Sequence, residues 1–192
     1  LGILSIEGDI IADGSDFGYA GAPDGWDWSD MGNYYGAGAS GINFYDNTVK
    51  YYFDTPSNGK KVEFKRTFPE DPKLKFSHTI KSANIRNDQS YLYGAPYSQN
   101  RFGIGSLPSN RTEFVVKGSM HDPEYMLAKE FSNFLKDSNF KVSGAALGYR
   151  QLNRPKIVYD SLQLLHVHKG ESILDIIKLT NEKSINLFAE GM

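Results

Sequence analysis

The segment spanning residues 14–41 constrains the fold of this chain more than any other stretch. It holds eight glycines together with Trp26, Trp28, Tyr34 and Tyr35. Glycine weakens the interior of a helix or a strand by roughly 0.5–1 kcal/mol relative to alanine, so a long regular element is excluded here. The aromatic content is too high for a solvated linker. We therefore predict an ordered loop whose rings pack against a sheet.

Short strands are expected on both sides of this loop. Residues 1–12 alternate apolar and polar positions, and residues 42–67 contain two strand-like runs separated by Asn58-Gly59. Asn-Gly tolerates the positive φ angles of a type I′ turn, so we predict a hairpin with that turn. Further strands are predicted at 76–85, 89–93, 112–116, 140–149 and 156–167.

Helical signals are confined to the second half of the chain. The run Asp122-Pro123-Glu124 combines a capping residue, a preorganised first position and an acid that complements the helix dipole. The apolar stripe expected on this helix, which should reach about residue 137, consists of Leu127, Phe131, Phe134 and Leu135. Helical spacing returns over 171–179, and a last helix is predicted from about Ser184. The expected class is α+β, β-rich with a few amphipathic helices.

Composition excludes several kinds of partner. Lys and Arg number 21 against 23 Asp and Glu, and a net charge of −2 gives no bulk attraction to nucleic acid or to an anionic membrane. No run approaches the roughly 20 apolar residues of a membrane-spanning helix. The absence of Cys excludes disulfides, thiolate metal sites and Cys nucleophiles. The chain begins at Leu1 in strand-like sequence, which suggests excision from a longer protein.

Two histidines form the best metal-binding pattern in the sequence. On a strand, His166 and His168 would point to the same face, as a metal site requires. The only other histidines are His78 and His121, and no third ligand is apparent. We therefore interpret the pair as two ordinary histidines and expect neither a metal nor another cofactor.

Other candidate sites have simpler explanations. The rings at positions 26–35 could stack on sugars, but we favour packing beside a sheet. The acidic pairs Asp13/Asp16 and Asp27/Asp30 could be glycosidase carboxylates, although capping of loops is the explanation we favour. The glycines do not form a dinucleotide or phosphate-binding motif.

A serine-asparagine motif near the end of the chain indicates acyl-transfer chemistry. Ser184-Ile185-Asn186 matches S-x-N, one of three elements of penicillin-recognising serine enzymes, the others being S-x-x-K and K-T-G. The tripeptide also occurs at Ser82-Ala83-Asn84 and Ser98-Gln99-Asn100, both in the β-rich region. Only the copy at 184–186 lies between two predicted helices, where a corner can expose a hydroxyl and an amide. The local alternative is that Ser184 caps the last helix.

Four segments of the chain, in order, resemble one enzyme family. They are Gly25–Ser40, Tyr93–Tyr97, Val115–Ser119 with Asp122-Pro123, and Asn181–Glu190. These segments resemble the D-alanyl-D-alanine carboxypeptidase/endopeptidases of the penicillin-binding protein 4 (DacB, peptidase S13) type, and the resemblance covers nearly the whole chain.

This resemblance implies a divided catalytic domain. In the family, a large insertion separates S-x-x-K from S-x-N and K-T-G. Residues 1–155 would be mostly insertion, with a smaller β subdomain nested near 60–115, and residues 156–192 would return to the transpeptidase-like domain. The nucleophilic Ser would lie outside this chain. The matches Ser57–Lys60 and Ser138–Lys141 lack the required helix start, and Lys117-Gly118-Ser119 inverts K-T-G.

The resemblance also implies an activity for the full-length protein. It would act on peptidoglycan stem peptides through an acyl-enzyme, react with β-lactams, and work in the periplasm or another extracytoplasmic space. Ser184 would relay a proton to the leaving amine, and Asn186 would position substrate. The 192 residues alone should be inactive. The rival hypothesis is a non-enzymatic β-rich module that binds cell wall or carbohydrate through its aromatic loop.

Overall fold

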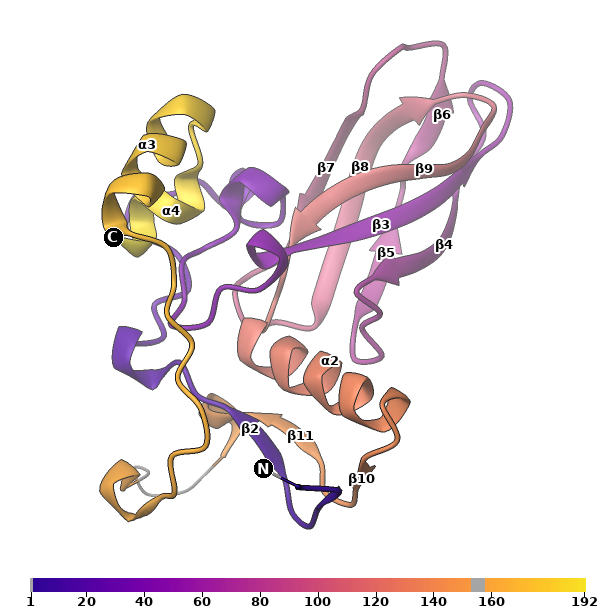
Figure 1. The fold of residues 1–192 in the computed structure, drawn as a ribbon. Coiled ribbons are helices and arrows are strands. Elements are labelled where there is room, and N and C mark those ends of the chain that lie inside the picture. Colours follow the sequence, from indigo (N-terminus) through magenta and orange to yellow (C-terminus); the bar gives the residue numbers. More distant parts are fainter. Residues whose placement is uncertain (1, 153–157) are drawn as a thin grey trace.

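The structure is a computed structural model that describes residues 2–152 and 158–192 (Figure 1). Its mixture of small sheets and a few separate helices confirms the α+β class. The helices are α1 (Trp28–Met31), α2 (Pro123–Asp137), α3 (Ile173–Lys183) and α4 (Asn186–Gly191). The strands are β1 (Ser5–Ile6), β2 (Ile10–Ala12), β3 (Thr48–Thr55), β4 (Glu63–Phe68), β5 (Lys75–His78), β6 (Lys81–Ala83), β7 (Gln89–Tyr93), β8 (Asn100–Pro108), β9 (Arg111–Ser119), β10 (Lys141–Val142) and β11 (Ala146–Gly148).

Strands β3 to β9 form a β unit of two sheets. In the first sheet β3 lies between β4 and β9, and both pairings are antiparallel. In the second sheet β8 pairs in parallel with β5 and then β6 along one side, and antiparallel with β7 along the other. The long central strands β3 and β8 therefore organise the unit, which occupies the upper right of Figure 1.

The core of the β unit lies between these sheets. Val49, Tyr51 and Phe53 are buried at every second position of β3, so one face of that strand supplies much of the core. The Phe76 ring on the second sheet lies 5.1 Å from the Tyr51 ring and 4.9 Å from the Phe64 ring. Full burial of each such side chain contributes about 1.5–3 kcal/mol to stability.

A second, smaller layer packs against the β unit. Strand β1 pairs in parallel with β10, and β2 with β11, so the entering and leaving segments of the chain lie side by side. Helix α2 packs across β2 and β11 and separates these strands from the β unit (Figure 1). Parallel pairing requires a crossover connection. Here the whole β unit and α2 serve as that connection.

The glycine-rich segment is an ordered loop, as predicted. It joins strands β7 and β9 through one backbone and one side-chain acceptor: the Ser119 amide donates to the Gly32 carbonyl at 2.9 Å, and the Leu92 amide donates to Asn33 Oδ1 at 2.9 Å. A Cβ on Gly32 would lie 2.1 Å from the Leu92 carbonyl oxygen. Only glycine permits this approach, which explains why the segment is rich in it.

The rings of this loop pack only partly as predicted. Trp28 and Tyr34 are each 54% exposed and Tyr35 is 38% exposed, while Trp26 is half-buried. Trp28 lies beside the sheet, with its ring 6.2 Å from the Tyr93 ring on β7, but three of the four rings are not buried in a core. Because the glycine backbone itself makes the close contacts with the strands, the side chains are left on the outside.

The predicted hairpin exists, but its turn is different. Strands β3 and β4 pair as expected, yet residues 56–62 separate them and Gly59 alone of the pair Asn58-Gly59 has a positive φ. The Gly59 amide donates to the Ser82 carbonyl at 2.7 Å, so strand β6 holds the loop open. The strand predicted at 76–85 is divided into β5 and β6, the region 140–149 holds two short strands, and β8 was not predicted.

Helix α2 is confirmed, but the predicted apolar face is only partly buried. Phe131 and Phe134 are 48% and 63% exposed. The residues of α2 that are buried instead are Pro123, Glu124, Tyr125, Met126, Ala128, Ser132 and Leu135. Because α2 lies between two layers, small and polar residues fit where two large rings would not.

The predicted strand at 156–167 is wrong over the residues that the structure describes. A short helical turn occupies residues 159–161, and no strand follows it before α3. Positions 156 and 157 of that prediction lie outside the described residues. Every residue from 158 to 175 is exposed, so this segment contributes little to the core.

Candidate active-site corner

The corner between α3 and α4 is shaped by local sequence. Helix α3 begins after Ser172, whose Oγ accepts a hydrogen bond from the Asp175 amide at 3.2 Å. The helix ends at Ser184, which adopts a left-handed conformation with φ 53° and ψ 54°. The Ser184 and Ile185 amides both donate to the Thr180 carbonyl, which satisfies the last turn. The chain then turns directly into α4.

The structure exposes both candidate site residues at this corner. Ser184 is exposed at the C-terminal cap of α3, and Asn186 is exposed at the first position of α4. Ile185 occupies the capping position of α4, so the alternative that Ser184 caps the last helix is wrong. The corner is anchored by Thr180 and Leu187, which are buried.

The side chain of Asn186 is oriented by the glycine-rich loop. Its Nδ2 donates to the Tyr35 carbonyl at 3.0 Å. No hydrogen bond from a described residue reaches its Oδ1, so that oxygen is the atom able to accept one from a ligand. The loop is closely packed at this point, because a Cβ on Gly36 would lie 2.0 Å from the Asp30 carbonyl oxygen. The corner and the aromatic loop are therefore neighbours, although 151 positions separate the bonded residues.

In the other two S-x-N copies, the serine hydroxyl makes hydrogen bonds with the backbone of the protein itself. Ser82 is buried on β6, and its hydroxyl donates to the Ser57 and Lys60 carbonyls. Ser98 lies in the loop before β8, where its Oγ accepts from the Asn100 amide at 3.2 Å. Neither serine stands at a corner between helices.

The S-x-x-K and K-G-S matches also lack a catalytic setting. Ser57 and Lys60 belong to the open loop between β3 and β4. Ser138 is the C-terminal cap of α2, and Lys141 begins β10. Lys117 lies on β9. None of these serines begins a helix, which the motif requires.

The histidine pair shows no metal site, and loop capping, the explanation favoured for the acidic pairs, fits Asp13 but not Asp27, whose side chain makes no capping hydrogen bond. His166 and His168 are exposed on the segment without a strand. Across residues 2–152 and 158–192, no group of three possible ligands could hold a metal ion. Asp13 caps its own loop by accepting from the Ser15 amide at 2.9 Å, as expected, and it also binds the Tyr159 hydroxyl.

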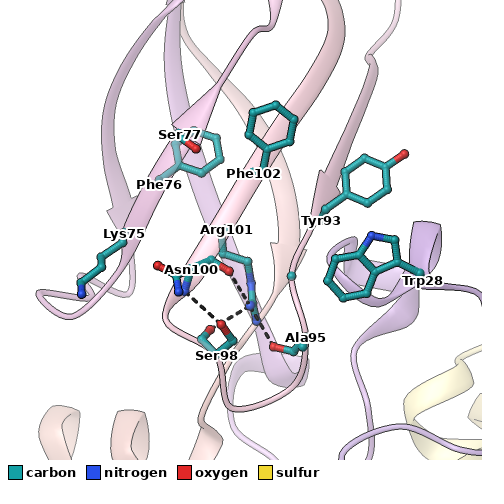
Figure 2. Close-up of a pocket in the computed structure, with 11 residues that line it drawn as sticks. Trp28, Lys75, Phe76, Ser77, Tyr93, Ala95, Ser98, Asn100, Arg101 and Phe102 are labelled. Atoms are coloured by element: carbon teal, nitrogen blue, oxygen red, sulfur yellow. Dashed lines mark hydrogen bonds between the residues drawn. The ribbon is translucent and has the colours of Figure 1, made fainter.

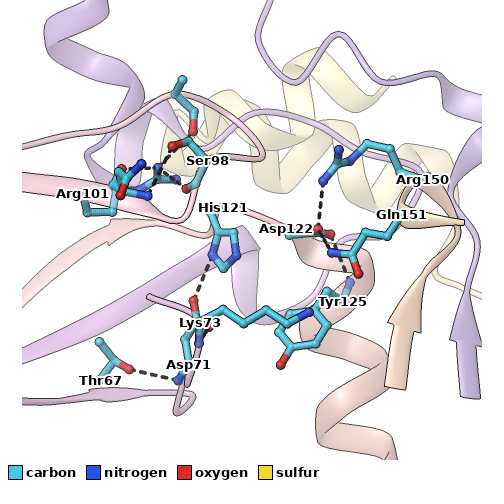
Figure 3. Close-up of polar contacts among 12 residues, drawn as sticks. Thr67, Asp71, Lys73, Ser98, Arg101, His121, Asp122, Tyr125, Arg150 and Gln151 are labelled. Carbon is cyan, nitrogen blue, oxygen red and sulfur yellow. Dashed lines mark hydrogen bonds and ion pairs between the residues drawn. The ribbon is translucent and has the colours of Figure 1, made fainter. Parts of the chain in front are cut away.

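A partly buried polar network joins the layers and was missed in the sequence (Figure 3). Asp122 Oδ2 accepts from Arg150 Nη2 at 3.1 Å and from Gln151 Nε2 at 2.7 Å. Glu124 accepts from the Gly14 amide at 2.8 Å and from the Arg150 amide at 3.1 Å. The sequence signalled only a helix start at these acids, because their partners lie far away along the chain.

A buried ion pair lies beside this network. Asp71 Oδ2 lies 2.9 Å from His121 Nδ1, and both side chains are almost fully buried. Burial of the Asp71 carboxyl acts to raise its pKa, but His121, together with the Lys73 amide and the Lys129 charge, outweighs that effect and leaves the pKa below its usual value. The pair joins the β4–β5 connection to the segment before α2.

Comparison with known proteins places the chain in a family. The sequence model of the D-Ala-D-Ala carboxypeptidase 3 (S13) family matches residues 1–192. The chain belongs to this family. The resemblance noted from the four collinear segments is thereby confirmed for the S13 chain as a whole.

Solved structures show a similar fold. A crystal structure of penicillin binding protein 4 (dacB) from Haemophilus influenzae matches with a TM-score of 0.70 at 19% identity, covering 99% of the S13 chain and 41% of its own. A complex of penicillin binding protein 4 from the same organism with a novel β-lactam matches with a TM-score of 0.59 at 16% identity, covering 99% and 39%. The S13 chain thus spans about two fifths of the length of these structures. Within its described residues, no helix has the length and apolar character needed to cross a membrane.

Proposed function

We propose that the full protein is a serine-type D-Ala-D-Ala carboxypeptidase/endopeptidase acting on peptidoglycan stem peptides, in the periplasm or another extracytoplasmic space. The observation that carries this proposal is the exposed corner at 184–186 in an S13 chain. The site is incomplete within the chain, because no described serine lies at the start of a helix with a lysine one turn after it. The nucleophilic Ser therefore belongs to a segment outside residues 1–192.

The domain arrangement follows from the same proposal. Residues 1–155 form the insertion, with the β unit nested inside it, and residues 156–192 return to the transpeptidase-like domain. Exposed apolar side chains support this division: Ile173 and Leu174 of α3 are 59% and 72% exposed, and Leu164 before the helix is 75% exposed. Large apolar side chains exposed in this number are typical of an interface. The remainder of the catalytic domain is the proposed partner.

The proposed chemistry divides between residues inside and outside the chain. The outside Ser attacks the carbonyl carbon of the penultimate D-Ala, and the amine of the terminal residue leaves. Ser184 relays a proton toward that amine, a general-acid contribution of typically 10²–10⁴-fold. Asn186 positions the substrate amide and the lysine of S-x-x-K through its free Oδ1. Water then hydrolyses the acyl-enzyme, and a β-lactam would acylate the same Ser.

The direct test is Ser184→Ala in the full-length protein. We expect kcat for D-Ala release to fall about 10²–10⁴-fold with little change in KM, because the lost step is proton transfer rather than binding. Asn181→Ala, an exposed substitution on α3, is the matched control and should leave kcat within about twofold. A Ser184→Ala enzyme that keeps its full rate would refute the assigned role.

Penicillin labelling tests the location of the nucleophile. Fluorescent penicillin should label the full-length protein on a Ser outside residues 1–192, as mapped by mass spectrometry, and should not label the 192-residue chain alone. Label found on Ser184, or on the isolated chain, would contradict the proposal. Glycan binding without any labelling of the full-length protein would favour the rival carbohydrate-binding module.

A further inference from the structure

A pocket on the outer face of the second sheet has no role in the chemistry proposed above. Its volume is about 460 Å³, and it lies where β5, β8 and β7 meet helix α1 (Figure 2). Ser77, Phe102 and Tyr93 are aligned across the three strands, so their side chains point to one face. Lys75 and Asn100 share that face one step along. The core-facing side of the same strands carries Phe76 and Leu92.

Aromatic rings form the walls of this pocket. Trp28 is 54% exposed and Phe102 is 40% exposed, although both are large apolar side chains. The Trp28 ring lies 6.2 Å from the Tyr93 ring at an interplanar angle of 37°, so the two rings form a tilted pair at one end (Figure 2). Ring faces exposed in this way suit a flat ligand with apolar C–H faces and polar edges, such as a sugar.

The charged residues that line the pocket are all basic. Lys75 stands at the opposite rim from Trp28, and Arg101 lies beneath the floor (Figure 2). Among the described residues that line the pocket there is no Asp or Glu. Ser98 and Asn100 add neutral hydrogen-bonding groups. This combination favours a ligand that carries hydroxyl or amide groups together with a carboxylate.

Arg101 keeps the pocket in a fixed shape. It is 3% exposed, and its Nη1 donates to the carbonyls of Ala95, Ser98 and Asn100 at 2.9, 2.8 and 3.3 Å. Its Nε and Nη2 are buried without a hydrogen-bond partner in the described chain, although the Tyr51 hydroxyl lies near the guanidinium. The loop between β7 and β8 is therefore held by a buried cation, and the pocket needs little rearrangement to bind.

We propose that this pocket binds the glycan strand of peptidoglycan, a chain of N-acetylated amino sugars of which every second one bears a carboxyl group that is free wherever no stem peptide is attached. Trp28, Tyr93 and Phe102 stack on the sugar faces, Ser98 and Asn100 bind their polar substituents, and Lys75 pairs with a free carboxylate. The proposal rests on the proposed function for its substrate class. It also gives the insertion a role, because the pocket would hold the polymer while the corner at 184–186 acts on a stem peptide.

A peptide ligand fits this pocket less well. Extended peptides bind most readily by adding a strand to an open sheet edge. The pocket lies on a sheet face, and β8 at its centre is already paired on both sides. The backbone groups of β8 at the centre of the pocket are therefore occupied, whereas the ring faces are not.

The test compares two glycans on the full-length protein by calorimetry. Glycan strands freed of peptide by an amidase should bind more tightly than chitotetraose, which lacks carboxylates. Trp28→Ala should weaken binding of the freed strands about tenfold or more, and Trp28→Phe should restore part of it. Trp26→Ala is the matched control, since Trp26 does not line the pocket, and should change the dissociation constant less than about twofold.

The charge has its own test. Lys75→Gln should remove the preference for freed strands over chitotetraose, whereas Lys81→Gln, a substitution on β6 outside the pocket, should keep it. Thermal unfolding of every variant shows that a loss of binding is not a loss of folding. The glycan proposal is overturned if wild-type protein binds neither glycan, or if Trp26→Ala and Trp28→Ala weaken binding equally. In that case, penicillin acylation of the same wild-type sample still reports separately on the proposed function.

Discussion

Individual buried polar residues make many of the contacts that join the parts of this protein. Asp71 and His121 pair below the surface, and Glu124 accepts two backbone amides from segments on either side of α2. A buried acceptor of this kind costs little when it is satisfied and a great deal when a partner is lost. These residues therefore fix how the β unit sits on its supporting layer.

Acid should weaken the protein through Asp71. Because the folded state holds the pKa of Asp71 below its unfolded value of about 4, the unfolded state binds the proton first as the pH falls. The stabilising contribution is complete above the unfolded pKa and is lost as the pH falls through the folded one. Urea unfolding between pH 7 and pH 3 should show this decline, and Asp71→Asn should reduce it while lowering stability at pH 7 by about 1–3 kcal/mol.

An exposed carboxylate provides the control for that experiment. Glu113 pairs with Arg66 at the surface, where its side chain is 55% exposed. Glu113→Gln should leave the acid dependence unchanged, because exposed pairs contribute little. Equal acid dependence in Asp71→Asn and wild type would mean that Asp71 does not account for the decline.

At the level of elements, α2 shows how two packing layers redistribute burial. A helix on the surface of a domain buries one stripe, which is the pattern used to predict it. Helix α2 is covered from both sides, so its buried set includes Glu124, Ala128 and Ser132 while two phenylalanines are exposed. The size and polarity of its side chains, read along the sequence, therefore do not identify which residues of α2 are buried.

Two alanine substitutions on α2 test this assignment. Met126 is fully buried, and Met126→Ala should lower the free energy of unfolding by about 2–5 kcal/mol through lost transfer energy and a cavity. Phe134 is 63% exposed, so Phe134→Ala should change the same quantity by less than about 0.5 kcal/mol. The sequence-based stripe predicts a large loss at Phe134. Chemical denaturation of both variants decides between the two assignments.

At the scale of the whole molecule, the chain returns to pair with its own first strands, and the segment that follows this pairing is exposed. Strands β1 and β2 are completed by β10 and β11, so residues 5–148 form a unit with its ends together. Residues 158–175 are exposed throughout and lead to α3, which packs against α4 but leaves Ile173, Leu174, Ile177 and Leu179 exposed. The closed part and the exposed part should therefore differ in stability.

Limited trypsin digestion should reveal that difference. In the 192-residue chain the first cut should fall at Lys169, because an exposed segment without strands or helices opens at little cost. In the full-length protein the same bond should resist, since the proposed catalytic domain covers it. First cuts within the β unit, for example at Lys60 or Lys81, would contradict the expectation. Equal sensitivity of Lys169 in both proteins would count against the proposed interface.

The sequence by itself determined the local features of this protein. Strand β7, the pairing of β3 with β4, the start and end of α2, and the irregular course of the glycine-rich loop all follow from neighbouring residues. The corner at 184–186 was also foreseen, as a break between two helical patterns. Four collinear segments identified the family. In each case the signal lies within a few residues of the feature that it predicts.

Only the tertiary structure decided which surfaces meet. Gly32 lies against β7 and Asn186 reaches Tyr35, and neither contact has a sequence signal, because the partners lie tens of residues or more apart. Contacts between residues far apart in the sequence also decided which aromatic rings are exposed, and so created the pocket at Trp28. Burial is a property of the space between elements. It depends on how the whole chain is packed, which no local pattern records.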